Sequence, residues 1–336
     1  MTPAAKPMPS PASTVKQASP VAATPPTAVG PGRTPDMMHA IYEVARKEVL
    51  QHVRTKRLLI VAPIFILVMV VITIILPASF GNMFLRGIRN NTEVALENYV
   101  FLLFASGFFI LSGFFYLQLL PMVLTVDSVC SEWSSRTIFL LLSKPVSRTS
   151  FVLGKFFGSA ATVVVTVGPL MLLDYIVMDQ FIPGGVDAGS FGRFLGFLGI
   201  VLLGCIAFTA LSLLVSTLTR SMAAAYLMAL AAWIFIFPLL GNLDTIVAVS
   251  QNGPAAFLAP SQYGVGWAVY LSPGESMRAA QNALAPHLGG ADSAFIQRLF
   301  GFGAQGDPVW AAVALLVQTA LFLGVSVLVV NRRNFE

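Results

Sequence analysis

The sequence predicts an all-α polytopic membrane protein with six transmembrane helices, and three observations lead to that class. Hydrophobic residues make up 56% of the 336 residues and charged residues only 10%, which is far from the composition of soluble globular proteins. The mean hydropathy is correspondingly high, at +0.80. The apolar residues also fall into long runs, each able to cross ~30 Å of hydrocarbon with about 20 helical residues.

The chain begins with a polar tail, residues 1–36, that is rich in Pro, Ala, Thr and Ser and is therefore expected to be disordered. It lacks the apolar core of a signal peptide, so we expect it to remain in the cytoplasm. Residues 37–57 follow with helical spacing of apolar and cationic side chains, which predicts an interfacial amphipathic helix. Its apolar face carries Ile41, Val44, Ala45 and Val49, and its cationic face carries Arg46, Lys47, Arg54, Lys56 and Arg57.

Six apolar runs then form a predicted transmembrane domain, residues 58–336. The predicted spans are 58–76, 99–126, 156–178, 191–218, 222–240 and 309–330. Pro121, Pro169 and Pro238 lie within three of these spans, where a missing backbone N–H is expected to kink the helix. The long outer loop 241–308 joins spans five and six and contains interrupted apolar pieces, typical of short amphipathic or re-entrant helices. These pieces serve either as a lid over an exit pathway or as a cap packed on the spans.

The distribution of cations sets the expected orientation, because short loops rich in Lys and Arg remain on the cytoplasmic side. Most of the 20 Lys and Arg residues lie in the tail or beside the predicted inner ends of the spans. Those on the predicted outer side are Arg86, Arg89, Arg193, Arg278 and Arg298. We therefore expect both termini in the cytoplasm, and the net charge of +5 indicates this bias and not a nucleic-acid surface.

The connector 127–155, between the second and third spans, is too polar to cross a membrane and carries more cations than acids. Within it, the apolar block 138–142 is followed by Pro145, which predicts a short interfacial helix that ends at the proline. These physical features alone describe an ordinary loop helix resting on lipid headgroups, with Lys and Arg reaching to phosphate.

A series of residues in the connector changes that interpretation. The series is Glu132, Arg136-Thr137, Leu140-Leu141-Leu142-Ser143-Lys144-Pro145-Val146-Ser147-Arg148 and Gly154-Lys155. It resembles the first cytoplasmic loop of type-2 ATP-binding cassette (ABC) transporter permeases, although that family commonly has Gly where Arg136 stands. The resemblance implies an N-terminal elbow helix, a cytoplasmic coupling helix and six spans. It also implies that a partner ATPase is coupled through Glu132, Arg136, Thr137, Pro145, Arg148 and Lys155.

A permease of the resembled family implies a transport subunit in the plasma or inner membrane, commonly for export. Its implied partners are two copies of a separate cytosolic ABC ATPase subunit, a second permease in a homodimer or heterodimer, and membrane lipids. The sequence has no G-x-x-x-x-G-K-[ST] phosphate loop, so we expect ATP hydrolysis in the partner and no enzymatic activity in this chain.

Two alternatives from other classes remain open. Asp174 lies deep in the third span, where a carboxylate is costly enough to mark a pathway, although its closeness to the outer end favours a structural role. A polytopic membrane enzyme would combine Asp174 with outer-loop groups such as Glu275 or His287. A non-transporting membrane scaffold would use the tail and the connector to recruit soluble partners. A neighbouring reading frame for a stand-alone ATPase favours transport over both.

No metal site, cofactor or disulfide is expected. His39, His52 and His287 have no second ligand at metal-binding spacing. Cys130 lies in the connector and Cys205 inside an apolar run, so the two are expected at different depths and do not readily pair.

Overall fold

The computed structural model describes residues 37–55, 57–70, 115–135, 147–181, 188–241, 243–253, 267–284 and 307–333. Within these ranges the chain consists of helices joined by turns and contains no strand. Three helical segments there are long and apolar enough to cross a membrane: Arg148–Leu173, Phe194–Leu218 and Pro308–Arg332. The all-helical class therefore agrees with the prediction, while the number of six spans stays a prediction.

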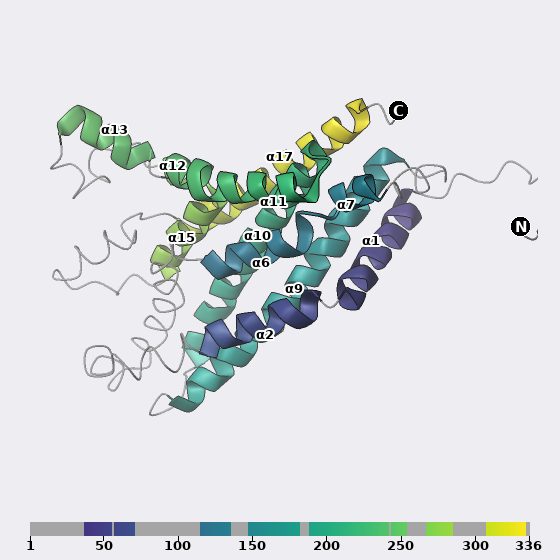
Figure 1. The fold of residues 1–336 in the computed structure, drawn as a ribbon. Helices are drawn as coiled ribbons and strands as arrows, with labels where there is room; N and C mark the ends of the chain where they lie inside the picture. Colours follow the sequence, from purple (N-terminus) through teal and green to yellow (C-terminus); the bar gives the residue numbers. More distant parts are fainter. Residues whose placement is uncertain are drawn as a thin grey trace, which may run out of the picture. The chain divides into compact units, whose positions relative to one another are not determined.

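The three long helices α9 (Arg148–Phe181), α10 (Ala188–Leu218) and α17 (Pro308–Arg332) contact one another (Figure 1). With 34 residues, α9 is about 51 Å long, so it projects beyond ~30 Å of hydrocarbon. It begins at Arg148, whereas the predicted span begins at 156. The last two residues of the connector, Gly154 and Lys155, are consequently helical and lie directly before the predicted span.

The hydrophobic core lies where α9, α10 and α6 (Phe115–Thr125) meet. Its buried members include Leu117, Val163, Val201 and Phe208. Buried hydroxyls are common within these helices, and many donate to a carbonyl one turn back in the same helix. These bonds include Thr162 to Gly158 at 2.9 Å, Thr166 to Thr162 at 2.7 Å and Ser212 to Phe208 at 2.8 Å. Such back-bonding satisfies the hydroxyls without a partner helix.

The first two predicted spans are described in part, as α2 (Arg57–Val70) and α6. Both helices contain a proline, Pro63 in α2 and Pro121 in α6. The Thr125 hydroxyl donates to the Pro121 carbonyl at 2.6 Å. The remainder of both spans, and the connection between them, lie outside the described residues.

The fifth predicted span consists of three consecutive segments, α11 (Met222–Ala231), the π-helix η3 (Ala232–Ile236) and α12 (Phe237–Gly241). The π-helix lies directly before Pro238, whose ring would clash with the carbonyl of residue 234 in a regular α-helix. The wider turn relieves that conflict. In η3, the Trp233 indole donates to the Gln118 side chain of α6.

Three short helices of the predicted outer loop are described: α13 (Leu243–Asn252), the 3₁₀-helix η5 (Ala268–Leu271) and α15 (Pro273–Leu284). A left-handed Gly253, with φ of 79°, follows α13. The next two helices lie against the long ones: α15 contacts α10 and α17, and the Gln318 side chain of α17 donates to the Tyr270 carbonyl at 2.7 Å. A Cβ on Gly204 of α10 would overlap Met277 of α15, so glycine permits this contact.

Candidate functional site

The short helix α7 (Cys130–Ser134) lies in the connector that the sequence singled out. The chain leaves α6 through two turns, in which Val126 N–H donates to the Met122 carbonyl and Ser128 N–H to the Thr125 carbonyl, both at 3.0 Å. The backbone between α6 and α7 is therefore held by hydrogen bonds and is not a flexible linker. The predicted helix at 138–142 lies outside the described residues.

A cluster of four charges, three of them buried, joins α7 to two other helices. Lys155 of α9 is 1% exposed, and its Nζ lies 2.8 Å from Glu48 Oε2 and 3.0 Å from Glu132 Oε1. Lys47 Nζ lies 2.9 Å from the same Glu132 oxygen. Because Lys47 and Glu48 belong to α1 (Met37–Arg54), the cluster holds α1, α7 and α9 together.

The cluster is electrically balanced, with two ammonium groups against two carboxylates. Burying such groups costs several kcal/mol per ion, and only close, well-oriented partners offset that cost. Lys155 meets this condition with two carboxylates and with the Phe151 ring, 5.5 Å from Nζ to the centroid. Removing Lys155 would leave the buried Glu48 carboxylate without its ammonium partner, whereas Glu132 would keep Lys47. The position of α7 thus depends on a charge that lies on α9.

Two glycines let α1 approach α9 closely enough to form this cluster. A Cβ added at Gly154 would lie 2.6 Å from Val44 Cβ, and one at Gly158 would lie 2.6 Å from the Ala45 carbonyl oxygen. Both glycines are on the α9 face that meets α1, because they are four residues apart. The buried residues of α1 are also four residues apart: Ala40, Val44, Glu48 and His52.

A second set of contacts fixes α7 to the end of α10. The Ser216 hydroxyl accepts hydrogen bonds from the backbone N–H groups of Val129 and Cys130, each at 3.0 Å. These two amides stand at the beginning of α7, where backbone donors lack partners within the helix. Burial raises the pKa of the Cys130 thiol above its ordinary value, and the Ser216 hydrogen bond opposes that effect only in part.

The Trp133 ring of α7 attracts two arginines from outside α7. The guanidinium carbons of Arg220 and Arg333 lie 5.6 Å and 5.5 Å from the ring centroid, within the range of a cation–π contact. Arg333 also donates to the carbonyls of Thr217 and Leu218, at 2.6 Å and 2.7 Å. Partial burial, and after it the nearby Arg220, lower the pKa of Arg333. Arg333, the residue after α17, therefore caps the end of α10 and also contacts α7.

Arg148, the first residue of α9, performs a similar capping role at the end of α17. Its Nη1 donates to the carbonyls of Val330, Asn331 and Arg333, at 3.4, 2.9 and 3.1 Å. These carbonyls belong to the last turn of α17 and the residue beyond it, where a helix has no internal donors left.

The structure thus brings together only some of the residues singled out in the sequence. Glu132 and Lys155 contact each other, whereas Arg148 makes the separate contact with the end of α17. Arg136, Thr137 and Pro145 lie outside the described residues. Asp174 belongs to α9, and its side chain is outside the description. A coupling role for any of these residues remains a prediction.

Sequence reasoning missed several residues that hold α7. Glu48, Ser216 and Arg333 were not singled out, although one signal pointed to the first. Glu48 follows Val44 by four residues, so an acid stands on the apolar stripe of an otherwise cationic helix. Ser216 and Arg333 carry no such signal, because their partners are distant in sequence: backbone groups for Ser216, and backbone carbonyls and the Trp133 ring for Arg333.

Both cysteines are buried and free, and they provide a test of this packing. Because burial also keeps the Cys130 thiol protonated, we expect neither cysteine to react with a maleimide at pH 8 in the folded protein, and both to react after denaturation. A Ser134→Cys variant is the matched control, since Ser134 is exposed on the same helix. If mass spectrometry detects rapid maleimide labelling of Cys130 in the folded protein, the packing of α7 described above is wrong.

Comparison with known proteins gives a consistent result. The model of the family described as "ABC-2 family transporter protein" matches residues 42–335. A probable ABC transporter permease protein NosY from Pseudomonas aeruginosa is 26% identical over 296 residues, covering 85% of this chain and 96% of the relative. The protein of the same name from Stutzerimonas stutzeri is 26% identical over 251 residues, covering 72% and 80% respectively.

Proposed function

Since the chain belongs to the ABC-2 transporter family as a membrane permease subunit, we propose that α7 and the surrounding connector 127–155 receive force from a cytosolic ATPase subunit. The proposed complex contains two ATPase copies and two permeases, as a homodimer or a heterodimer, in the plasma or inner membrane. Both termini face the cytoplasm, and the direction of transport is export. The family groups the chain with transport components and not with the membrane enzymes considered above.

One observation carries the proposal: α7 is a five-residue helix with separate attachments to three other helices and to the residue that follows α17. Glu132 connects it to α1 and α9, its first amides bind α10, and Trp133 contacts the arginine that follows α17. Close-packed elements have little room to yield, so a displacement of α7 passes to its neighbours. This arrangement supports a role in passing movement of an ATPase to the transmembrane helices.

Asp174 has a secondary place in the proposal, as a polar group along a substrate pathway beside α9. An ionisable residue within a membrane span usually faces protein or water, and the helix that carries Asp174 also carries Lys155. Movement of α7 would thus reach the same helix.

The division of labour is tested by ATP hydrolysis. We expect the purified chain alone to hydrolyse no ATP, because its sequence has no phosphate loop, whereas a complex with its co-expressed ATPase subunit should do so. Turnover by the isolated chain that survives removal of contaminating ATPases would contradict the assignment.

The coupling surface is tested by a substitution at Ser134, which is exposed on α7 and lies outside the buried charge cluster. We expect Ser134→Arg to lower the amount of co-purifying ATPase about tenfold, the equivalent of ~1.4 kcal/mol, through steric obstruction of the docking surface. The unfolding temperature of the permease alone should not change.

Asn331→Arg is the matched control, because Asn331 is exposed near the end of α17 and is outside α7. It should retain the ATPase. Normal retention and normal stimulated turnover in Ser134→Arg would remove α7 from the coupling surface, even if the chain remains a permease subunit.

A further inference from the structure

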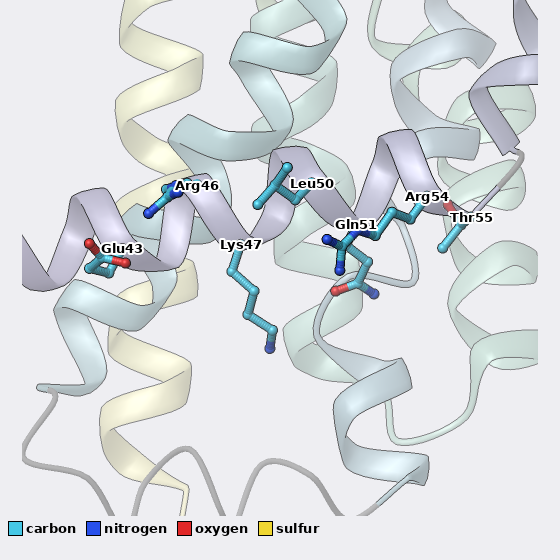
Figure 2. A pocket seen from close by; sticks show the side chains of 7 residues that line it. All are labelled: Glu43, Arg46, Lys47, Leu50, Gln51, Arg54 and Thr55. Atoms are coloured by element: carbon cyan, nitrogen blue, oxygen red, sulfur yellow. The ribbon is translucent and has the colours of Figure 1, made fainter.

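The strongest unassigned feature is a groove of about 440 Å³ along α1. Among the described residues, it is lined by Glu43, Arg46, Lys47, Leu50, Gln51, Arg54 and Thr55, all on α1 or directly after it. Figure 2 shows these side chains following the length of the helix. This face is separate from the stripe that α1 packs against α9.

The groove is cationic. Arg46 and Arg54 contribute two positive charges and Glu43 contributes one negative charge, while a third cation, Lys47, is paired with Glu132. Guanidinium groups donate in a planar fork that fits the oxygens of a phosphate, and both arginines are exposed. The groove therefore fits an anionic ligand with exposed oxygens, such as a phosphate.

The surroundings of the groove identify the source of that phosphate. Thr55 ends the groove, and α2 begins at Arg57 with an exposed apolar stripe formed by Ile60, Ile64 and Leu67. Their spacing of four and three residues places them on one face of the helix. A cationic groove followed along the chain by an apolar helix face matches a lipid, with a polar anionic head and apolar chains.

We propose that the groove binds an anionic phospholipid, with its headgroup in the groove that Arg46 and Arg54 line and its acyl chains along α2. Lys47 joins the groove to the buried cluster, since its Nζ lies 2.9 Å from Glu132 while 47% of its side chain is exposed. The bound phosphate therefore lies beside the attachment of α7. This inference requires neither an ATPase nor a coupling role for α7.

The test uses the full chain in a neutral detergent and counts bound lipids by native mass spectrometry. Mixed micelles contain phosphatidylglycerol or an equal amount of phosphatidylcholine. We expect the wild type to prefer phosphatidylglycerol, and Arg46→Gln combined with Arg54→Gln to reduce that preference roughly tenfold or more, since each cation near an anionic lipid contributes appreciably. These substitutions leave Lys47 and the buried cluster unchanged.

Arg332→Gln is the matched control, because Arg332 is an exposed cation at the end of α17, outside the groove. It should keep the wild-type preference. If the control and the double variant lose the preference for phosphatidylglycerol equally, general surface charge explains the effect and the proposed site is wrong. An unchanged preference in the double variant would overturn it as well.

Two further measurements keep the result decisive. Glycerol phosphate at millimolar concentration tests the headgroup without acyl chains, and it should not displace the lipid. Full displacement would identify a soluble phosphate as the ligand and overturn the lipid. If the glutamine variant fails to fold, Arg46→Lys with Arg54→Lys retains the charges, and we expect it to keep a reduced preference for phosphatidylglycerol; no reduction would contradict the role of the guanidinium forks.

Discussion

Lys155→Met should destabilise this protein more than any other single substitution at the α7 attachment. The variant removes the ammonium group that contacts both Glu48 and Glu132, and Lys155 itself is fully enclosed. Truncating one partner of a buried ion pair costs about 3–5 kcal/mol, because the other charge stays buried without its partner. We expect a loss of that size in the free energy of unfolding, measured by denaturant titration in detergent micelles.

Two companion variants separate charge from packing. Lys47→Met removes a cation that contacts the same Glu132 oxygen, but this side chain is 47% exposed. Exposed pairs contribute less than about 1 kcal/mol, so its effect should be small. Adding Glu48→Gln and Glu132→Gln to Lys155→Met should recover part of the loss, because no buried charge then lacks a partner. Equal losses for Lys155→Met and Lys47→Met would contradict the buried cluster.

Gly158→Ala should separate α1 from α9. The added methyl group would lie 2.6 Å from the Ala45 carbonyl oxygen and 2.7 Å from Glu48 Cβ, and the backbone oxygen cannot move aside as a flexible side chain can. Overpacking of this kind costs about 1–3 kcal/mol. Displacement of α1 would also pull Glu48 away from Lys155, which adds to the loss.

The displacement has a direct readout in limited proteolysis. Trypsin should cleave after Arg46 and Lys47 faster in Gly158→Ala than in the wild type, as measured by mass spectrometry of the released peptides. Gly199→Ala is the control, because a Cβ at Gly199 of α10 meets no atom within 4 Å. It should be neutral or slightly stabilising, since alanine favours a helix over glycine by roughly 0.5–1 kcal/mol. Unchanged proteolysis in Gly158→Ala would mean that α1 tolerates the added methyl group.

The amphipathic segment 37–57 shows what helical periodicity leaves open, and its interfacial position stays a prediction. Helical spacing predicted a helix there, and the structure has α1 from Met37 to Arg54. The sequence suggested that its apolar face would rest on the membrane. In the structure, Val44 of that face is buried against α9, because glycines at 154 and 158 create a surface that accepts it. Periodicity identifies a face but not the surface that covers it.

The predicted spans show a related limit. Composition placed the boundary of the third span at 156, because Lys155 is charged and the preceding residues are mixed. The helix in fact begins at Arg148, since Arg148 and Lys155 both find partners from other helices. A charged residue ends a hydrophobic run in the sequence, but it does not end a helix whose neighbours supply the countercharge.

The sequence by itself determined the helical membrane class and the resemblance to a permease family that the comparison with known proteins confirmed. These properties follow from local composition and from motifs of adjacent residues. Only the tertiary structure decided that Glu132 and Lys155 form one cluster with Glu48, and that Ser216 and Arg333 fix α7. Contacts between residues separated by scores of positions depend on how the helices pack, and that packing follows from shape and burial over the whole bundle.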